Sequence, residues 1–343
     1  MARYRDIEEA RYIKRIESIT ELLPAKAVAF INSKYSVYQP GTKARYCEDL
    51  LSFFAYIADV LHTDKDARAL DGELADITPQ DIEQYLTYLS RYEDDDGKVR
   101  RNSPVSLKRS LSAIRSFYKY MTKNRFIDRD PAALVDAPKV HDKDIIALDA
   151  DDKQAVLSAV SAGTGLTTRE QAHLKHHSVR DSAVLSVLLG TGMRVSELVG
   201  LDLGDVDMTR NRLKVIRKGG DEDHVYFGDE VAEALGAYLI ERKGIPAVET
   251  DKDALFLSQE RTRLSVRSVE RLLKKYGRLT QMGDTIHPHT CRKTFASSAL
   301  EENDLTAVAA ALGHKTTATT SKYYTKISEQ AKRNVAETPV FQQ

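Results

Sequence analysis

The stretch GTGMRVSEL, residues 190–198, is the most informative part of this sequence for both fold and chemistry. Its two glycines permit a tight turn, and in the helix expected after it Arg194 and Glu197 lie one turn apart on the same face. An arginine held by a carboxylate is oriented in advance, and its planar guanidinium matches the oxygens of a phosphate. The alternative is an ordinary surface ion pair, which is worth about 0–1 kcal/mol.

A second motif, IHPHTCRKTFA, covers residues 286–296. His289 and Arg292 are three residues apart, so both side chains leave one face of a helix near its N-terminus. There, backbone N–H groups and the helix dipole favour an anion. A metal site is the alternative, but no glutamate follows at the spacing of a metalloprotease helix, and His-x-His places two ligands poorly on a helix. We therefore expect no metal here.

A third motif, LGHKTTATTSKYY, covers residues 312–324. We expect Gly313 to end one helix as a left-handed cap and the threonines to cap the next, which carries Tyr323 and Tyr324. A phenol has a pKa of about 10 and is a weak nucleophile near neutral pH until a base or nearby cations activate it. The alternative is an amphipathic helix whose tyrosines pack in the core.

In this order, the motifs resemble those of the tyrosine recombinase (phage integrase) family, and in particular its Xer-like two-domain members. The family pattern joins a TGxRxxEL box, a GKG hairpin lysine, an HxxR box, an LGH box and a tyrosine nine residues beyond the last histidine. The matching segments here are TGMRVSEL, RKGG, HTCR, LGH and Tyr323. The resemblance implies a catalytic set, with Glu197 in support, that comprises Arg194, Lys218, His289, Arg292, His314 and Tyr323.

The resemblance also implies a site-specific DNA recombinase. Tyr323 would attack a scissile phosphate and form a 3′-phosphotyrosine, while the two arginines neutralise the charge that grows on the phosphate. Lys218 would protonate the leaving 5′-oxygen, His289 would help to deprotonate the tyrosine or orient the phosphate, and His314 would hydrogen-bond the phosphate. The protein–DNA bond stores the phosphodiester energy, so neither metal nor ATP is required. Strand exchange between two sites implies a homotetramer on double-stranded DNA and a Holliday junction.

The hairpin departs from the family pattern. Family hairpins often read GKGxKxR, whereas residues 217–223 read RKGGDED. Asp221 and Asp223 therefore stand where basic residues are common. This departure leaves the DNA contacts of the hairpin open, but it does not change the role that the resemblance implies for Lys218.

The nucleophile also has an alternative, because Tyr323 and Tyr324 are adjacent and some family members place the tyrosine one residue later. Both tyrosines can share a helical stripe with Ile327 and Ala331. The nine-residue spacing from His314 favours Tyr323.

Two other functions remain possible. A type IB topoisomerase also cuts DNA with a tyrosine but relaxes DNA instead of exchanging strands, and a regulator could bind DNA without catalysis. Among recombinases, the role could be integration and excision of a mobile element or resolution of chromosome or plasmid dimers.

The first half of the chain predicts amphipathic helices over residues 42–61, from Thr78-Pro79 and from Ser103-Pro104. The last of these buries an apolar stripe and presents cations on its other side, which suits a DNA backbone. A solvated helix face is the alternative. This half resembles the SAM-like core-binding domain of the same family. The expected DNA-binding residues are Lys108, Arg109, Arg115, Lys119 and Lys123.

The second half mixes helices with a small hairpin, so we expect a mainly α protein with a mixed α/β catalytic domain. The expected helices span residues 149–159, 180–189, 194–200, 230–243, 266–278, 290–301 and 305–312. The expected hairpin strands span residues 212–216 and 224–227. We expect a loop over residues 161–178. The expected division is an N-terminal extension (1–22), a helical core-binding domain (23–138), a linker (139–147), a catalytic domain (148–332) and a tail that docks in trans (333–343).

Composition sets the remaining limits. The 343 residues hold 51 Lys+Arg against 51 Asp+Glu, so any basic surface must be local, as in residues 98–129. No apolar run reaches the ~18 residues of a membrane helix, and the charged first residues are unlike a signal peptide. The two cysteines, Cys47 and Cys291, are far apart, which fits a reducing compartment. We expect a cytoplasmic, nucleoid-associated protein without a membrane partner.

Overall fold

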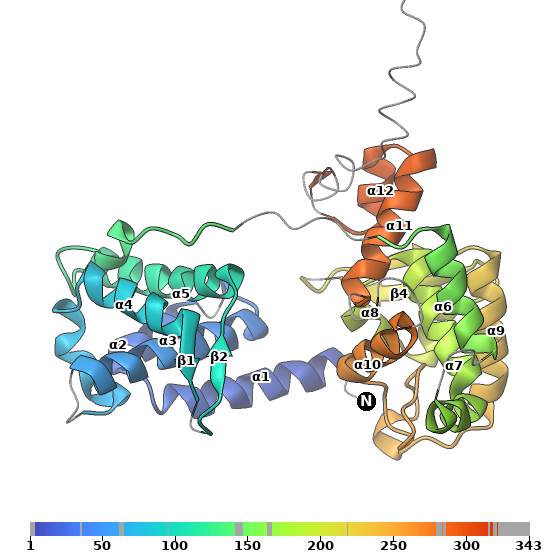
Figure 1. Cartoon of the computed structure of the whole chain (residues 1–343), viewed down its shortest axis with the longest axis horizontal. Helices are drawn as coiled ribbons and strands as arrows, with labels where there is room; N and C mark the ends of the chain where they lie inside the picture. Colours follow the sequence, from blue (N-terminus) through green and yellow to red (C-terminus); the bar gives the residue numbers. More distant parts are fainter. Residues whose placement is uncertain are drawn as a thin grey trace, which may run out of the picture. The chain divides into compact units, whose positions relative to one another are not determined.

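The structure is a computed structural model. It describes residues 4–34, 36–61, 65–94, 96–140, 147–162, 167–217, 219–278, 283, 286–314, 316–317 and 321. The chain divides into two compact units, Met1–Asp142 and Lys143–Gln343 (Figure 1).

The first unit is helical, with one short antiparallel hairpin. Its hairpin, β1 (Arg91–Glu93) and β2 (Val99–Arg101), was not expected. In the turn between the two strands, the Gly97 N–H donates to the Asp94 carbonyl at 2.8 Å. Short 3-10 helices cover Ala67–Asp71, Glu73–Ala75 and Pro131–Leu134. The α-helices are α1 (Tyr4–Thr20), α2 (Ala25–Ser33), α3 (Pro40–Leu61), α4 (Pro79–Ser90) and α5 (Pro104–Lys123).

Helices α4 and α5 begin where the sequence predicts, because side chains cap their first turns. Thr78 and Asp81 form a reciprocal capping box at α4, with Pro79 in the first turn. The Ser103 hydroxyl accepts the Ser106 N–H at the start of α5. Edge-to-face rings then join α2, α3 and α5 in one core, with Phe117 5.4 Å from Phe54 and 5.8 Å from Phe30 between centroids.

The described residues of the expected N-terminal extension, which begin at residue 4, are part of the folded first unit. Helix α1 packs along α3, the Arg15 guanidinium donates to the Glu48 carboxylate at 3.0 Å, and Ile19 and Leu23 are buried in the core. The segment that we expected as an extension is thus a helix of the unit.

Helix α5 has the two faces that its sequence predicts. Its apolar stripe is buried in the core, while Lys108, Lys119 and Lys123 are exposed. The two arginines make contacts within the unit: Arg109 forks onto the Asp49 carboxylate at 3.1 Å and 3.1 Å, and Arg115 donates to main-chain carbonyls that include that of Ala132 at 3.2 Å. The three exposed lysines therefore form a cationic face on this helix.

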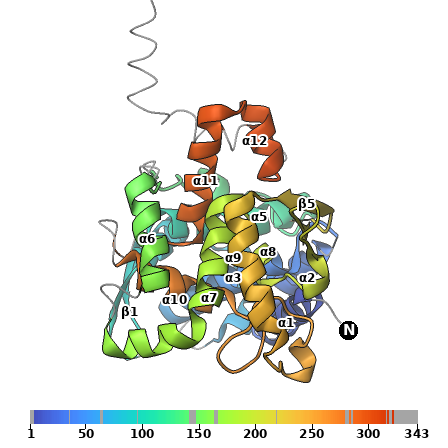
Figure 2. The same cartoon turned by 90° about the vertical axis from the view of Figure 1, so that its right-hand side faces the viewer.

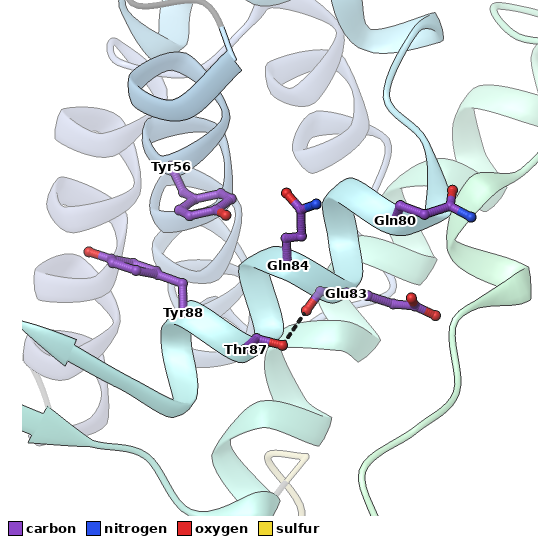
Figure 3. A pocket seen from close by; sticks show the side chains of 6 residues that line it. All are labelled: Tyr56, Gln80, Glu83, Gln84, Thr87 and Tyr88. Atoms are coloured by element: carbon purple, nitrogen blue, oxygen red, sulfur yellow. Dashed lines mark hydrogen bonds between the residues drawn. The ribbon is translucent and has the colours of Figure 1, made fainter.

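An open groove of about 570 Å³ lies on the first unit between α3 and α4 (Figure 3). The Tyr56 and Tyr88 rings lie at one end with centroids 4.9 Å apart. The Thr87 hydroxyl donates to the Glu83 carbonyl within α4. None of the expected catalytic or DNA-binding residues lines this groove. Its lining residues are Tyr56, Gln80, Glu83, Gln84, Thr87 and Tyr88.

The second unit combines α-helices with a small sheet. Helices α6, α7 and α9 lie side by side in both views (Figures 1 and 2). Short 3-10 helices cover Leu203–Asp205 and Glu249–Asp251. The α-helices are α6 (Ala150–Ala162), α7 (Thr168–Thr191), α8 (Val195–Val199), α9 (Asp229–Lys243), α10 (Val266–Gly277), α11 (Pro288–Glu302) and α12 (Leu305–Ala311).

The expectation of a loop over residues 161–178 is wrong for the described part of that range, where residues 161–162 end α6 and residues 168–178 lie in α7. Helix α7 begins at Thr168, because Thr167 and Glu170 form a capping box, with the Thr167 N–H 3.0 Å from the Glu170 carboxylate. The polar, histidine-containing stretch is the first part of this long helix.

The sheet has three antiparallel strands, β3 (Val206–Asp207), β4 (Arg212–Ile216) and β5 (Glu222–Tyr226), where two were expected. Strand β5 begins two residues before the expected start. The Arg217 N–H donates to the Asp221 carbonyl at 2.8 Å, so the turn closes early and Glu222 already pairs with Ile216.

The first residues of the second unit are attached to α11. The Leu148 N–H donates to the Thr294 hydroxyl at 2.9 Å, and the Lys153 ammonium lies 3.2 Å from the Ser298 hydroxyl. The Thr294 hydroxyl in turn donates to the Thr290 carbonyl at 2.9 Å.

The expected fold class is confirmed: the protein is mainly α, with small antiparallel sheets. In the portion of the chain that the structure describes, no helix combines the length and apolar character needed to cross a bilayer.

Candidate active site

Arg194 occupies the N-cap of α8, directly after the glycine turn. Glu197 binds it twice: the carboxylate accepts the Arg194 backbone N–H at 2.8 Å and the Nη1 group at 2.8 Å. The Glu197 side chain is 3% exposed, whereas that of Arg194 is 29% exposed. The buried carboxylate therefore holds the guanidinium in one orientation while part of it still reaches solvent. An ordinary surface ion pair does not orient an arginine in this way.

Arg292 lies on α11, buried at 3% exposure. Its Nη1 donates to the Gly192 carbonyl at 2.8 Å, and its Nη2 donates to the Leu312 carbonyl at 2.7 Å. These acceptors come from the turns before α8 and after α12. One guanidinium thus joins the three motifs, and because the carbonyls are neutral they orient it without cancelling its charge.

Two glycines make this junction possible. Gly192 ends α7 at φ +60°, and a Cβ there would lie 2.6 Å from the Phe295 ring. Gly313 follows α12 at φ +63°, and a Cβ there would lie 2.6 Å from Arg217 Nε. Both positions need a left-handed backbone and close approach, which only glycine allows.

His314 is held as a neutral imidazole. Its Nε2 lies 2.9 Å from Arg292 Nη2, and because a guanidinium can only donate, Nε2 must be the acceptor. Burial, followed by the charges of Arg292, Arg194 and Arg217, lowers the pKa of His314 from 6.5 to about 4. Its Nδ1–H is then a hydrogen-bond donor.

This shift predicts a pH dependence of stability. The folded protein resists protonation of His314 while the unfolded chain accepts a proton near pH 6.5, so the stabilising contribution is complete above that pH and is lost as the pH falls toward about 4. We expect the free energy of unfolding of the DNA-free protein to fall more between pH 7.5 and pH 5 than that of His314→Gln. Urea unfolding of both proteins measures the difference, and equal falls would contradict the assignment.

His289 and the N-cap residue His287 stand at the start of α11. His287 Nδ1 accepts the Thr290 N–H at 3.1 Å, so it caps the helix. Burial, together with the charges of His287 and Arg292, lowers the pKa of His289. The lowered pKa keeps the His289 imidazole unprotonated at neutral pH, which is the form that a general base must have.

Arg217, which the sequence did not single out, is also part of this cluster. It is 8% exposed and donates through Nη1 to the Glu197 carboxylate at 3.2 Å. Its Nε donates to the Asp223 carboxylate at 2.8 Å, which lowers the pKa of Asp223 against the effect of burial. The acidic residue at 223 therefore pairs with a buried arginine six residues earlier. In the sequence, the opposite charges of Arg217 and Asp223 on either side of the glycine turn could have suggested this pair.

The joined side chains carry a positive balance. Among the described residues linked by these contacts, three guanidinium groups meet two carboxylates, and Asp223 lies toward solvent with a side chain 43% exposed. Such a cluster at the ends of helices suits a phosphate. Lys218, Tyr323, Tyr324 and the 333–343 tail lie outside the described residues.

Residues 159–331 match the phage integrase family, and residues 33–125 match the N-terminal SAM-like domain of phage integrases. The chain belongs to the phage integrase family. The two matches fall within the two units of the structure.

Curated relatives of this integrase-family chain are tyrosine recombinases. It is 34% identical over 286 residues to the tyrosine recombinase XerC of Pelobacter propionicus, which covers 83% of this chain and 84% of that one. It is 34% identical over 234 residues to the tyrosine recombinase XerD of Staphylococcus epidermidis, across 68% of this chain and 75% of the relative. The protein is therefore an enzyme, a Xer-like tyrosine recombinase that performs site-specific recombination.

Solved structures show the same fold at lower identity. The XerH site-specific recombinase bound to palindromic difH substrate superposes with a TM-score of 0.64 at 17% identity, over 95% of this chain and 94% of that one. The Tn1549 transposon integrase in complex with a circular intermediate DNA gives 0.65 at 19% identity, over 91% and 97%. Both likenesses concern the fold of this recombinase.

Proposed function

We propose that this recombinase cleaves and rejoins both strands of a specific DNA site through a 3′-phosphotyrosine at Tyr323 and a Holliday junction. The observation that carries the proposal is that the Arg292 guanidinium bonds to two of the other motifs. It donates to the Gly192 carbonyl, two residues before Arg194, and to His314 Nε2. A phosphate bound there meets two guanidinium groups and an imidazole donor. The DNA complexes of the structural relatives XerH and Tn1549 integrase support double-stranded DNA as the substrate.

The proposed chemistry balances without an external cofactor. The Tyr323 oxygen attacks phosphorus, the bond from phosphorus to the 5′-oxygen breaks, and the tyrosine proton passes to neutral His289. Lys218 gives a proton to the leaving 5′-oxygen. Arg194 and Arg292 neutralise the charge that develops on the non-bridging oxygens, and the His314 Nδ1–H donates to one of them. Religation reverses these steps with a 5′-hydroxyl from the partner strand.

Exposed cations support the proposed grip on DNA. On α5, Lys108, Lys119 and Lys123 form an exposed face that would neutralise phosphates, without requiring a basic protein overall. Arg109 and Arg115 have acceptors within the first unit, and their contact with DNA stays a prediction.

Recombination between two sites calls for four active sites, so we propose a homotetramer on DNA, with the 333–343 tail reaching a neighbouring subunit. The outcome is a property of the DNA sites and not of the active-site chemistry. It is either integration and excision of a mobile element or resolution of chromosome or plasmid dimers.

Covalent trapping tests the proposal. Duplexes selected by binding to the full-length protein from a randomised pool, and then nicked beside the cleavage point, should give a denaturation-resistant protein–DNA adduct. Two intact copies of the site should give a Holliday junction. Relaxation of supercoiled plasmid with no junction would instead support a type IB topoisomerase. Tight binding without any adduct would support a non-catalytic DNA-binding regulator.

A further inference from the structure

Arg217 is held by three elements at once. Its guanidinium donates to Glu197 on α8 at 3.2 Å, to Asp223 on β5 at 2.8 Å and to the Ala311 carbonyl at the end of α12 at 3.1 Å. A side chain that is 8% exposed and bonded in three directions has little freedom to move.

The backbone of the same residue forms the base of the hairpin turn. The Arg217 N–H donates to the Asp221 carbonyl at 2.8 Å, and its carbonyl accepts the Gly220 N–H at 2.9 Å. The turn between β4 and β5 is therefore closed at Arg217 itself. Whatever fixes this side chain also fixes the end of the hairpin.

The Arg217 guanidinium also packs against the turn that carries Gly313 and His314. The space where a Cβ of Gly313 would stand lies 2.6 Å from Arg217 Nε and 2.8 Å from its Cζ. The guanidinium fills the room that the glycine leaves, so the hairpin end and the Gly313–His314 turn are packed together.

We propose that Arg217 is a positioning residue that anchors the β4–β5 hairpin to the catalytic pocket. In doing so it fixes the point in the chain directly before Lys218, the proposed general acid. The inference rests on the proposed function. Arg194 does not depend on Arg217 for its orientation, because Glu197 already binds it through both its N–H and its Nη1. Loss of Arg217 therefore impairs protonation of the leaving group more than it weakens the grip on the phosphate.

The test compares two suicide substrates, one with the normal 5′-oxygen and one with a 5′-bridging sulfur, which leaves without needing a proton. General acid catalysis contributes roughly 10²–10⁴-fold, so partial misplacement in Arg217→Gln should slow cleavage of the oxygen substrate by about 10–10²-fold. Cleavage of the sulfur substrate should be slowed much less. Lys218→Ala should show the same pattern with a larger loss, and Arg217→Lys should recover part of the rate.

Arg212→Gln is the matched control. Arg212 lies on β4, the strand that leads to Arg217, and its Nε donates to the Asp207 carboxylate at 3.0 Å. Among the described residues, its hydrogen bonds do not reach Glu197 or the Gly313 turn. This variant should cleave both substrates as the wild type does. Asp223→Asn is a second, milder probe on a side chain that is 43% exposed, and it should show a smaller loss with the same preference for sulfur.

The ratio of the two rates within one variant does not depend on how much of the protein is folded. Equal slowing of both substrates by Arg217→Gln and Asp223→Asn, or no slowing of either, would overturn the positioning role. If the wild type trapped neither substrate, the proposed function itself would fail, which is a different result.

Discussion

Tyr323→Phe is expected to bind the selected duplex as the wild type does and to form no covalent adduct with the nicked suicide substrate. The substitution removes one hydroxyl oxygen, which is the proposed nucleophile, and keeps the aromatic ring. Gel-shift titration measures binding, and denaturing electrophoresis of the labelled duplex measures the adduct.

Tyr324→Phe is the matched control, because it makes the same chemical change one residue later. It should retain adduct formation. If Tyr324→Phe forms no adduct while Tyr323→Phe does, the nucleophile is the tyrosine ten residues beyond His314. Proteolysis of the trapped wild-type complex and mass analysis of the DNA-linked peptide would identify the residue directly.

Arg292→Ala is expected to lower the cleavage rate by at least about 10²–10³-fold, which is the usual loss when one donor to a developing oxyanion is removed. It should also destabilise the second unit. The Gly192 and Leu312 carbonyls lose a charged donor in a buried place, and an unpaired buried polar group costs about 1–3 kcal/mol. Single-turnover cleavage and urea unfolding measure the two effects separately.

Arg242 provides the control for the structural part of that loss. It is 5% exposed and also braces main-chain carbonyls, those of Ala254, Ile245 and Lys252, away from the site. Arg242→Ala should destabilise the unit to a similar degree and leave the cleavage rate of the folded molecules unchanged. If the two variants lose activity equally per folded molecule, the phosphate contact assigned to Arg292 would be wrong.

Local signals predicted most of the helices. The stripe from Leu107 to Met121 and the caps at Thr78 and Ser103 act within one or two turns, so the sequence states them directly. The same kind of signal was present at Thr167 and Glu170, but the polar residues after it suggested a loop. A polar stretch indicates that residues are exposed to solvent, and the exposed part of a helix is as polar as a loop.

The site was predictable in parts. Arg194 and Glu197 interact across a single helical turn, and spacing alone suggested their pair. The family resemblance placed Arg292 and His314 in one site, although 22 residues separate them. No local pattern could show that the Arg217 side chain reaches a carbonyl 94 residues later, because that contact depends on how α12 packs against the hairpin.

The attachment of Leu148 to Thr294 has a mechanical consequence. The chain enters the second unit through a hydrogen bond to α11, two residues along that helix from Arg292. A force applied along the preceding segment would load this bond and, through it, α11. In a single-molecule pulling experiment, we expect this load to shift α11 along its axis. The shift would change the distances between Arg292 and its carbonyl acceptors.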